Sequence, residues 1–381
     1  MRRHLVAPRE GWQQAVEAWG MTYHTHEGEP YWFESAYYEF TLDEVNELES
    51  ATNEVYRLCL EAVESIVQKG DYERLKLPEE IRGLVEESWE DDDYPNLYGR
   101  FDFSYSGGGK PKLLEFNADT PTALLEAAVI QWKWKEELFP EADQFNSIWE
   151  GLVETWEWFK DRNSFGLPLI HFTSVQSDED LMTVTLLRDA AEAVGLMTDF
   201  LYLEDIGFRE TTNSFVDLAG RPIRTLFKLY PWEWLIDDEF GVHAMQGRGQ
   251  VKWIEPAWKA ILSSKAILPI LWELFPGHPN LLPAFFDDPN GMTAYAKKPI
   301  FSREGANVTL VGEGDDCTME GPYGEEGYIY QALAPLPRFD GARPVIGSWV
   351  IGGESRGIGV RESNGPITDN LSRFVPHLFW A

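Results

Sequence analysis

The stretch YGRFDFSYSGGGKPKLLEFNAD, residues 98–119, decides the fold predicted for this chain. Its two halves alternate polar and apolar residues with the period of a β-strand, and SGGGKP at 106–111 has the composition of a turn. The sequence therefore predicts a β-hairpin. Four apolar side chains are expected to point from this hairpin into the core: Phe101, Phe103, Leu114 and Phe116.

The other face of the predicted hairpin is polar. With SGGGKP as the loop, Asp102 lies opposite Glu115. Arg100 lies opposite Asn117 in the same register. Two carboxylates directly across a ladder repel each other unless a cation lies between them. Carboxylate and amide oxygens are ligands that Mg²⁺ takes together with substrate phosphates, so this face predicts a metal site. The alternative is a solvated polar face neutralised by Arg100 and Lys112.

Helical and strand patterns surround the hairpin. Apolar residues recur at helical spacing through 40–68, which predicts an amphipathic helix. A second helical pattern runs through 122–160, and a third helix is expected to follow Pro256 and to carry Lys265 near its end. A buried strand at 167–172 followed by a helix at 178–194 suggests a βα unit. Further strands are expected at 223–230, 294–300, 306–311, 328–332, 345–351 and 357–361.

Composition narrows the class of protein. The chain has 381 residues, of which 44% are hydrophobic and 14% aromatic, so one large folded body is expected. No apolar run is long enough to cross a membrane, which predicts a cytoplasmic protein. Cys59 and Cys317 are too few for a disulfide framework or a cysteine-rich zinc site. The formal net charge of -32 argues against nucleic-acid binding; it indicates either solubility alone or attraction of a polycationic substrate.

A second group of candidate site residues, after the polar face of the hairpin, lies in KKPIFSREGAN, residues 297–307. A strand that carries Lys298 and is followed by a polar, glycine-containing bend with Arg303 can fold over phosphates. The commoner outcome for such a stretch is an ordinary hairpin with exposed basic residues. Lys265 could reach a phosphate or could be a surface lysine. The strand at 327–337 ends at two prolines and leaves backbone groups that could pair with an adenine edge.

Several other patterns are less informative. SGGGK at 106–110 lacks the glycine spacing and the Ser/Thr of a P-loop. The paired tryptophans Trp132/Trp134 and Trp232/Trp234 are interpreted as core and pocket wall, because the acidic charge disfavours a stacking platform for nucleic acid.

Five ordered motifs resemble the glutathionylspermidine synthase family. They are YGRFD at 98–102, LEFNADT at 114–120, FKLYPWE at 227–233, SKA at 264–266 and KPIFSREGAN at 298–307, with VRE at 360–362 following last. The resemblance covers nearly the whole chain. It implies a mixed α+β, ATP-grasp-like fold that holds ATP between two α+β lobes, with Mg²⁺ bridging its phosphates.

The resemblance also implies roles for individual residues. The metal ligands would be Asp102, Glu115 and Asn117. ATP would be held by Lys265, Lys298, Gly305 and the backbone of Gln331, Ala332 and Leu333, with Arg100 at the γ-phosphate. Arg303 would close a lid over the reacting phosphoryl group. The acid substrate would face Thr120 and Arg361. By charge alone, Glu233 or Glu126 is a candidate to hold the amine and help it lose its proton.

The implied function is a carbon–nitrogen ligase that phosphorylates a carboxylate and lets an amine, such as a polyamine, attack the acyl phosphate. Three lobes are expected: a helical scaffold with the hairpin at 1–160, a central α/β lobe at 161–281 and a nucleotide-binding lobe with its lid at 282–381. The protein is expected to be a monomer or homodimer. The alternatives are a nucleotide-binding regulator without ligase activity and a purely structural interaction protein.

Two departures from the family pattern bear on the substrates. The 381 residues leave no room for the amidase region of the bifunctional relatives, so hydrolysis of the product is not expected. Leu229 stands where glutathionylspermidine synthase itself has a hydroxyl residue that contacts glutathione. The motif therefore does not specify glutathione as the acid.

Overall fold

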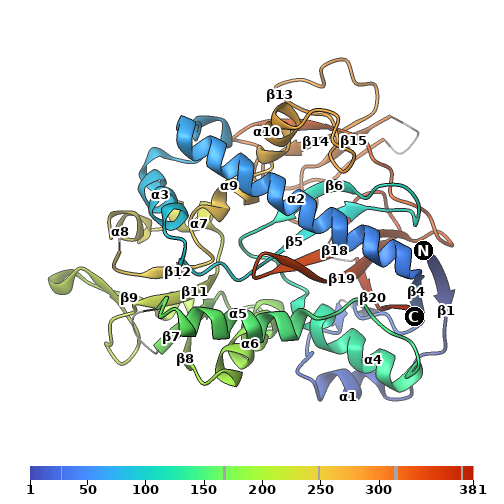
Figure 1. Cartoon of the computed structure of the whole chain (residues 1–381), viewed down its shortest axis with the longest axis horizontal. Coiled ribbons are helices and arrows are strands. Elements are labelled where there is room, and N and C mark those ends of the chain that lie inside the picture. The colour runs from blue at the N-terminus through green and yellow to red at the C-terminus, as the bar shows by residue number, and fades with distance from the viewer. Residues whose placement is uncertain (27, 166–168, 248, 313–315, 370–371, 381) are drawn as a thin grey trace.

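The computed structural model of the chain describes residues 1–381 except 27, 166–168, 248, 313–315, 370–371 and 381. It is a mixed α+β fold in which three large sheets are flanked by helices (Figure 1). No helix of the described residues is long and apolar enough to cross a bilayer.

An antiparallel sheet of order β20-β19-β18-β5-β6 occupies the centre of the molecule and joins the predicted hairpin to the C-terminal part of the chain. Its strands are β5 (Tyr98–Ser104), β6 (Lys112–Asn117), β18 (Arg343–Ile351), β19 (Glu354–Ser363) and β20 (Arg373–Val375). Three strands from within 282–381 thus belong to the same sheet as the hairpin. The long helix α2 (Leu42–Lys69) crosses one face of this sheet (Figure 1).

Helix α2 confirms the helix expected at 40–68. Thr41 and Glu44 form a capping box at its start, and Gly70 ends it in the left-handed conformation. Its buried stripe includes Cys59, which excludes that thiol from solvent. Burial also raises the pKa of the Cys59 thiol, so it is not a nucleophile.

The hairpin has the predicted register at its polar end and a bulge nearer the loop. Asp102 pairs with Glu115, but Phe103 pairs with Leu113, so the register shifts by one residue between them. Leu114 is therefore the extra residue of a β-bulge. The prediction that Leu114 points into the core is wrong, because the bulge turns it to line a cavity on the opposite side. As expected, the three phenylalanines of the hairpin point into the core: Phe101, Phe103 and Phe116. Leu113 is buried beside them.

A parallel sheet of order β12-β11-β7-β8 confirms the βα unit. Its strands are β7 (Leu169–Ser174), β8 (Met197–Tyr202), β11 (Thr225–Leu229) and β12 (Lys252–Ile254), and α6 (Asp178–Ala193) connects the first two. Residues 167 and 168 of the expected strand lie outside the described residues. Helix α5 (Ile148–Asp161) packs beside α6 (Figure 1).

The third large sheet has the order β13-β17-β14-β15-β16. Its strands are β13 (Ala284–Phe286), β14 (Tyr295–Pro299), β15 (Thr309–Val311), β16 (Cys317–Thr318) and β17 (Tyr328–Ala332). Two short helices, α9 (Lys259–Ser263) and α10 (Ile267–Leu274), precede it in the chain, and α10 packs against the sheet. Lys265 lies between these helices and not near the end of one longer helix, which corrects the expectation. The Lys265 N–H donates to Ile300 O at 2.9 Å and ties this break to the sheet.

The remaining elements frame these sheets. A three-stranded sheet of β1 (Arg2–Leu5), β4 (Ala36–Phe40) and β21 (His377–Phe379) brings the two chain ends together. Small two-stranded sheets are formed by β2 (Thr25–His26) with β3 (Glu29–Pro30), and by β9 (Gly207–Arg209) with β10 (Ser214–Val216). The other helices are α1 (Trp12–Glu17), α3 (Arg82–Glu90), α4 (Gln131–Leu138), α7 (Trp232–Asp237) and α8 (Gly241–Gln246), with the single-turn elements η1 (Glu73–Leu75), η2 (Glu79–Ile81), η4 (Leu203–Asp205) and η5 (Glu210–Thr212).

The helical pattern at 122–160 is not one helix. It begins with the π-helix η3 (Glu126–Ile130), continues as α4, and is interrupted from Phe139 until α5 begins at Ile148. The interruption contains Pro140, which disfavours a helical conformation at Phe139 before it. Short π-helical segments of this kind are frequent at functional sites.

Candidate active site

The polar face of the hairpin brings the three proposed metal ligands together. Asn117 Nδ2 lies 3.3 Å from Asp102 Oδ2 and 3.4 Å from Glu115 Oε1. The amide therefore presents its nitrogen to the two carboxylates, and a flip of the amide would present its oxygen to a cation instead. Two carboxylates and one amide on adjacent strands are a donor set that suits Mg²⁺. The residues present fit the implied metal.

Three basic side chains converge on these carboxylates: Arg100 from β5 itself, Lys265 from the segment between α9 and α10, and Lys298 from β14. Lys265 Nζ lies 3.2 Å from Glu115 Oε2, and Arg100 Nε donates to Asp102 Oδ1 at 2.8 Å. Burial raises the pKa of Glu115, but the ammonium groups of Lys265 and Lys298 outweigh it and hold that pKa at about 2. The carboxylate is thus ionised and available to a cation across the physiological pH range.

A cavity of about 160 Å³ opens directly beside this polar face. Its wall is made of residues from the hairpin, the third sheet and the segment 366–368, and it includes Leu114, Lys298, Gly305 and the backbone of 331–336. Lys298 Nζ donates to Leu114 O and to Gln331 Oε1, both at 2.8 Å. Burial lowers the pKa of Lys298 to about 8, with Glu115 opposing that shift. The bulge thus lets Leu114 line this cavity, which it would not do in a regular hairpin.

Gly305 is required by the shape of this cavity. It has φ +71°, and a Cβ there would lie 2.5 Å from Ile367 Cγ2 and 2.8 Å from Thr368 O. Any side chain would therefore both strain the backbone and fill the cavity.

The strand end at 331–333 offers fewer free groups than its sequence suggests. Ala332 N–H donates to Pro283 O at 2.7 Å and Leu333 N–H donates to Ala294 O at 3.2 Å. Two of the backbone groups considered for an adenine edge, the N–H groups of Ala332 and Leu333, are therefore already bonded to neighbouring segments. An adenine edge at this place would have to use the carbonyl oxygens.

Arg303 closes the space on the other side of the metal ligands. Its Nη1 donates to Thr120 Oγ1 at 3.0 Å, and its Nη2 donates to Glu233 Oε1 at 2.6 Å. Its Nε is buried and has no hydrogen-bond partner among the described residues. The same holds for Arg361 Nε, whereas Arg361 Nη2 donates to Asp369 O. Buried guanidinium N–H groups without a partner are suited to an anionic ligand.

Glu126, a candidate for holding the amine, lies near Arg361 and another acidic residue, Glu179. Glu126 is 1% exposed, and its Oε1 has no hydrogen-bond partner in the described part of the chain. Burial raises the pKa of Glu126 to about 7; nearby Glu179 adds to the rise, while the Tyr31 hydroxyl and Arg361 oppose it. Burial likewise raises the pKa of Asp180 to about 7, again with Glu179 adding to it. Both carboxyls can exchange a proton near neutral pH.

Asp119 and Lys228 form a buried pair that the sequence did not reveal. Lys228 Nζ lies 2.8 Å from Asp119 Oδ1, and both side chains are 1% exposed. Asp119 Oδ2 also accepts from the Trp232 N–H at 2.9 Å. The pair joins the loop that carries Thr120 to the start of α7, which carries Glu233. The signal was available, because Lys228 is the only charged residue within the apolar run 225–232.

Lys228→Met is expected to destabilise the protein by about 3 to 5 kcal/mol, because it leaves the buried Asp119 carboxylate without a counter-ion. Urea unfolding measures this loss. The matched control is Lys252→Met, since Lys252 pairs with Asp91 at 2.7 Å but both side chains are at least one-third exposed; about 1 kcal/mol or less is expected there. Equal small losses in both variants would contradict the importance of the buried pair.

Comparisons with known proteins agree with this arrangement. The family model described as glutathionylspermidine synthase preATP-grasp matches residues 3–380. A Haemophilus influenzae protein described as "Putative acid–amine ligase" is 43% identical over 367 residues, which cover 93% of this chain and 92% of that protein. Trypanothione synthetase of Crithidia fasciculata is 32% identical, over 83% of this chain and 52% of that protein.

Two further matches extend the comparison. The bifunctional glutathionylspermidine synthetase/amidase of Escherichia coli is 29% identical, over 89% of this chain and 58% of that protein. The chain thus spans little more than half of this enzyme and of trypanothione synthetase. Among solved structures, a glutathione synthetase-like effector from Globodera pallida superposes with a TM-score of 0.57 at 12% identity, covering 97% of this chain and 96% of that one. This likeness concerns the fold alone.

Proposed function

Because the chain belongs to the glutathionylspermidine synthase family, we propose that it is an ATP-dependent carbon–nitrogen ligase that joins a carboxylic acid to an amine through an acyl phosphate. The observation that carries this proposal is the convergence of an oxygen donor set, two lysines and a cavity at one edge of the hairpin. ATP would occupy the cavity with its phosphates directed toward Glu115, Lys265 and Lys298. Magnesium, when bound there, would neutralise charge on the transferring phosphoryl group.

Arg303 and Arg361 are proposed to hold the acid and the phosphoryl group during transfer. Both carry a buried N–H that has no partner among the described residues, and a carboxylate or a phosphoryl oxygen would satisfy it. Arg303 already reaches across to Thr120, so the bend at 302–307 lies closed over the candidate acid site. With the acid held there, its carboxylate oxygen attacks the γ-phosphorus, ADP leaves, and the acyl phosphate forms.

The amine is proposed to enter on the side of Glu126 and Asp180. An amine is protonated at neutral pH and must lose a proton before its lone pair can attack the acyl carbon. Glu126 has an oxygen with no partner in the part of the chain that the structure describes, and a pKa of about 7, so it can take that proton. Phosphate then leaves as the amide bond forms. Glu233 fits this role less well, because Arg303 already neutralises it.

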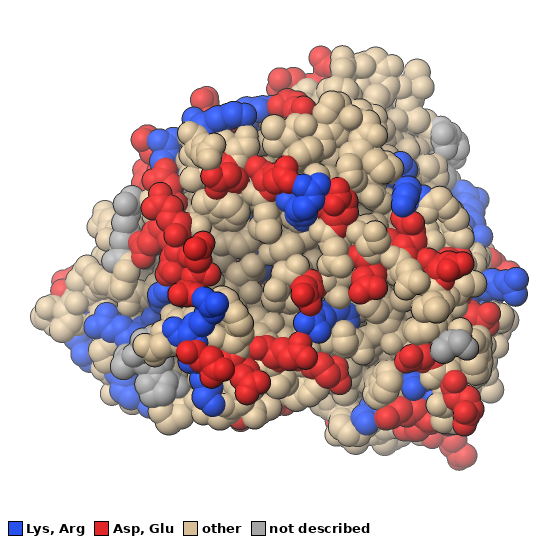
Figure 2. All heavy atoms as spheres, viewed as in Figure 1, with Lys and Arg blue, Asp and Glu red and all other residues tan. Residues whose placement is uncertain are grey.

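The overall charge favours a cationic amine. Figure 2 shows acidic side chains spread over much of one face, with fewer basic ones between them. Such a surface attracts a polyamine before it reaches the site and repels anionic competitors.

The proposal is tested by measuring ADP and phosphate release while small peptides and acids are screened against polyamines and amino acids. Turnover is expected only when magnesium, an acid and an amine are all present. ATP with magnesium should in any case stabilise the fold, by about 2.7 kcal/mol at 100-fold excess over Kd. Stabilisation without turnover for any pair would instead identify a nucleotide-binding regulator. No change in melting temperature would reject the nucleotide site itself.

A further inference from the structure

A small cavity lies between the proposed metal ligands and the proposed acid site. Its volume is about 20 Å³, which is room for one group of the size of a water molecule. Glu115 and Asn117 of the metal set line it, together with Thr120 and Arg303 of the acid site. The cavity therefore joins the two halves of the proposed reaction.

Three polar atoms of residues that line this cavity are buried and have no hydrogen-bond partner among the residues that the structure describes. They are the hydroxyl oxygens of Ser263 and Ser302 and the Nε of Arg303. A buried polar group without a partner costs free energy, so three of them around one space indicate a ligand that the free chain lacks. Arg303 already has a proposed role, but the two serines do not.

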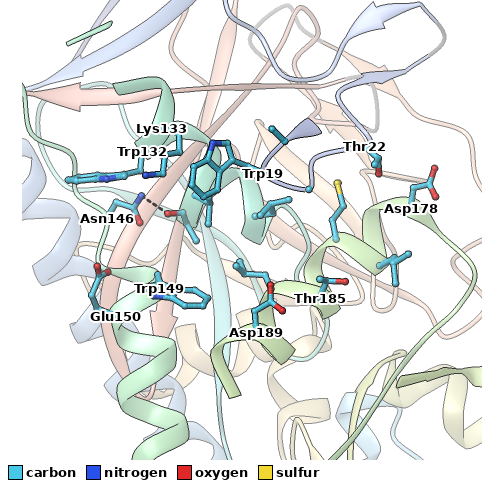
Figure 3. A pocket seen from close by; sticks show the side chains of 18 residues that line it. Trp19, Thr22, Trp132, Lys133, Asn146, Trp149, Glu150, Asp178, Thr185 and Asp189 are labelled. Atoms are coloured by element: carbon cyan, nitrogen blue, oxygen red, sulfur yellow. Dashed lines mark hydrogen bonds between the residues drawn. The ribbon is translucent and has the colours of Figure 1, made fainter. Parts of the chain in front are cut away.

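A larger cavity between α4, α5 and α6 has no such atoms (Figure 3). Its volume is about 750 Å³, and Trp19, Trp132 and Trp149 form aromatic walls around it. None of its lining residues carries a buried side-chain N or O atom that lacks a partner within the described ranges. The smaller cavity is therefore distinguished by its polar atoms and not by its size.

Contacts of Lys265 bring the segments that carry the two serines together. The Lys265 N–H donates to Ile300 O at 2.9 Å, and Lys265 Nζ donates to Ser302 O at 2.7 Å. Ser263 lies two residues before Lys265, at the end of α9. These bonds therefore fix the end of α9 against the start of the bend at 302–307.

The charges around the cavity favour an anion once a metal ion is bound. Glu115 and Glu233 are balanced by Lys265 and Arg303, which pair with them. A magnesium ion on the metal ligands adds two positive charges, which attract an oxyanion to the neighbouring space. Hydroxyl and guanidinium groups can all donate hydrogen bonds to its oxygens. A single water molecule is the alternative occupant, but it carries no charge to match that of the ion.

We propose that Ser263 and Ser302 donate hydrogen bonds to the non-bridging oxygens of the phosphoryl group as it passes from ATP to the acid, an inference that rests on the proposed ligase function. Both hydroxyls keep their protons throughout. The P–O bond to ADP breaks and its electron pair leaves with ADP, while an oxygen of the carboxylate forms the new P–O bond. Donors that are already in place stabilise the transferring group without rearranging when it arrives.

Binding of inorganic phosphate is measured by calorimetry on the full chain saturated with ADP and magnesium, with neither acid nor amine present. The wild-type protein is expected to bind phosphate saturably. Ser263→Ala and Ser302→Ala should each weaken phosphate binding about tenfold, since a hydrogen bond to a charged group contributes at least that factor. The affinity for ADP should not change, because neither serine lines the cavity assigned to ATP.

Ser164→Ala is the matched control. The Ser164 hydroxyl is likewise buried and has no partner in the described part of the chain, but Ser164 lines neither cavity beside the hairpin. Its phosphate affinity should equal that of the wild type. Without ligands, all three alanine variants should melt at the wild-type temperature or above it, because each loses a hydroxyl that has no protein partner. Melting curves thus separate weaker binding from misfolding.

The outcomes distinguish the role of the two hydroxyls from the proposed function. If ADP does not bind the wild-type protein, the nucleotide site is rejected and the ligase with it. If ADP binds but phosphate binds equally to the wild type and both serine variants, or to none of them, only the role of the hydroxyls is overturned. A lower melting temperature of the serine variants with unchanged phosphate affinity would identify a buried water as their partner and would also overturn that role.

Discussion

Glu115→Gln is expected to lower the rate of amine-dependent ADP release by about a thousandfold, a loss typical of removing one group that stabilises developing charge. The substitution keeps the shape of the side chain and removes one carboxylate charge from the proposed metal site. It also leaves Lys265 and Lys298 without the carboxylate that now lies between them. Initial rates at increasing magnesium concentration measure the effect, which added magnesium should relieve only in part.

Asp102→Asn should act in the same direction, because Asp102 is the cross-strand partner of Glu115. Glu90→Gln is the matched control: Glu90 is exposed at the end of α3 and lies outside the cavity beside the hairpin. A folded Glu115→Gln protein with the full rate at ordinary magnesium concentration would show that the metal ligands have been assigned wrongly.

The register on which this prediction depends could be read from the sequence only at the polar end of the hairpin. Period-two alternation and a turn of six residues predicted that Asp102 faces Glu115, and the structure confirms that pairing. Nearer the turn, Ser104 pairs with Lys112, so the connection has seven residues. The extra residue is absorbed by the bulge at Leu114. Nothing in the local alternation marks a bulge, and the Leu114 carbonyl that it presents is bound by Lys298 from a distant part of the chain.

Contacts between distant segments were the least predictable part of the site. The motifs around Lys265, Lys298 and Arg303 were recognised individually, and the family resemblance placed them together. Their neighbours were not foreseen: Arg303 pairs with Glu233, and Lys265 donates to Ser302 O at 2.7 Å. Such pairs depend on how three sheets are arranged around the hairpin. Strand and helix periodicity determines which face a residue occupies but does not specify the element that will face it.

Glu126→Gln is expected to have opposite effects on activity and on stability. Burial holds the pKa of this carboxyl at about 7, above its ordinary value of 4.5. The group therefore contributes stability that is fully present below pH 4.5 and is lost as the pH rises through 7. The gap between the two values corresponds to about 3 kcal/mol. Glutamine cannot ionise, so the free energy of unfolding should rise by up to that amount at pH 8 and change little near pH 4.

Activity should fall in the same variant, because glutamine cannot accept the proton of the attacking amine. A loss of about a hundredfold or more in kcat/KM for the amine is expected. The wild-type value should climb between pH 6 and pH 8 as Glu126 loses its proton, and that limb of the profile should be absent in the variant. Glu141→Gln, at an exposed position in the segment between α4 and α5, is the matched control and should alter neither quantity.

The two readouts separate the role of Glu126 in chemistry from a role in structure. A purely structural carboxyl would change stability and leave the pH profile of the amine-dependent step intact. A carboxyl that only attracts the amine would raise KM without removing the limb near pH 7. A buried Glu126 carboxylate that is ionised at pH 8 destabilises the fold, and the proposed mechanism explains its presence because the ionised form accepts the proton of the amine. The mechanism therefore requires that Glu126→Gln is more stable at pH 8 and that its kcat/KM no longer rises between pH 6 and pH 8.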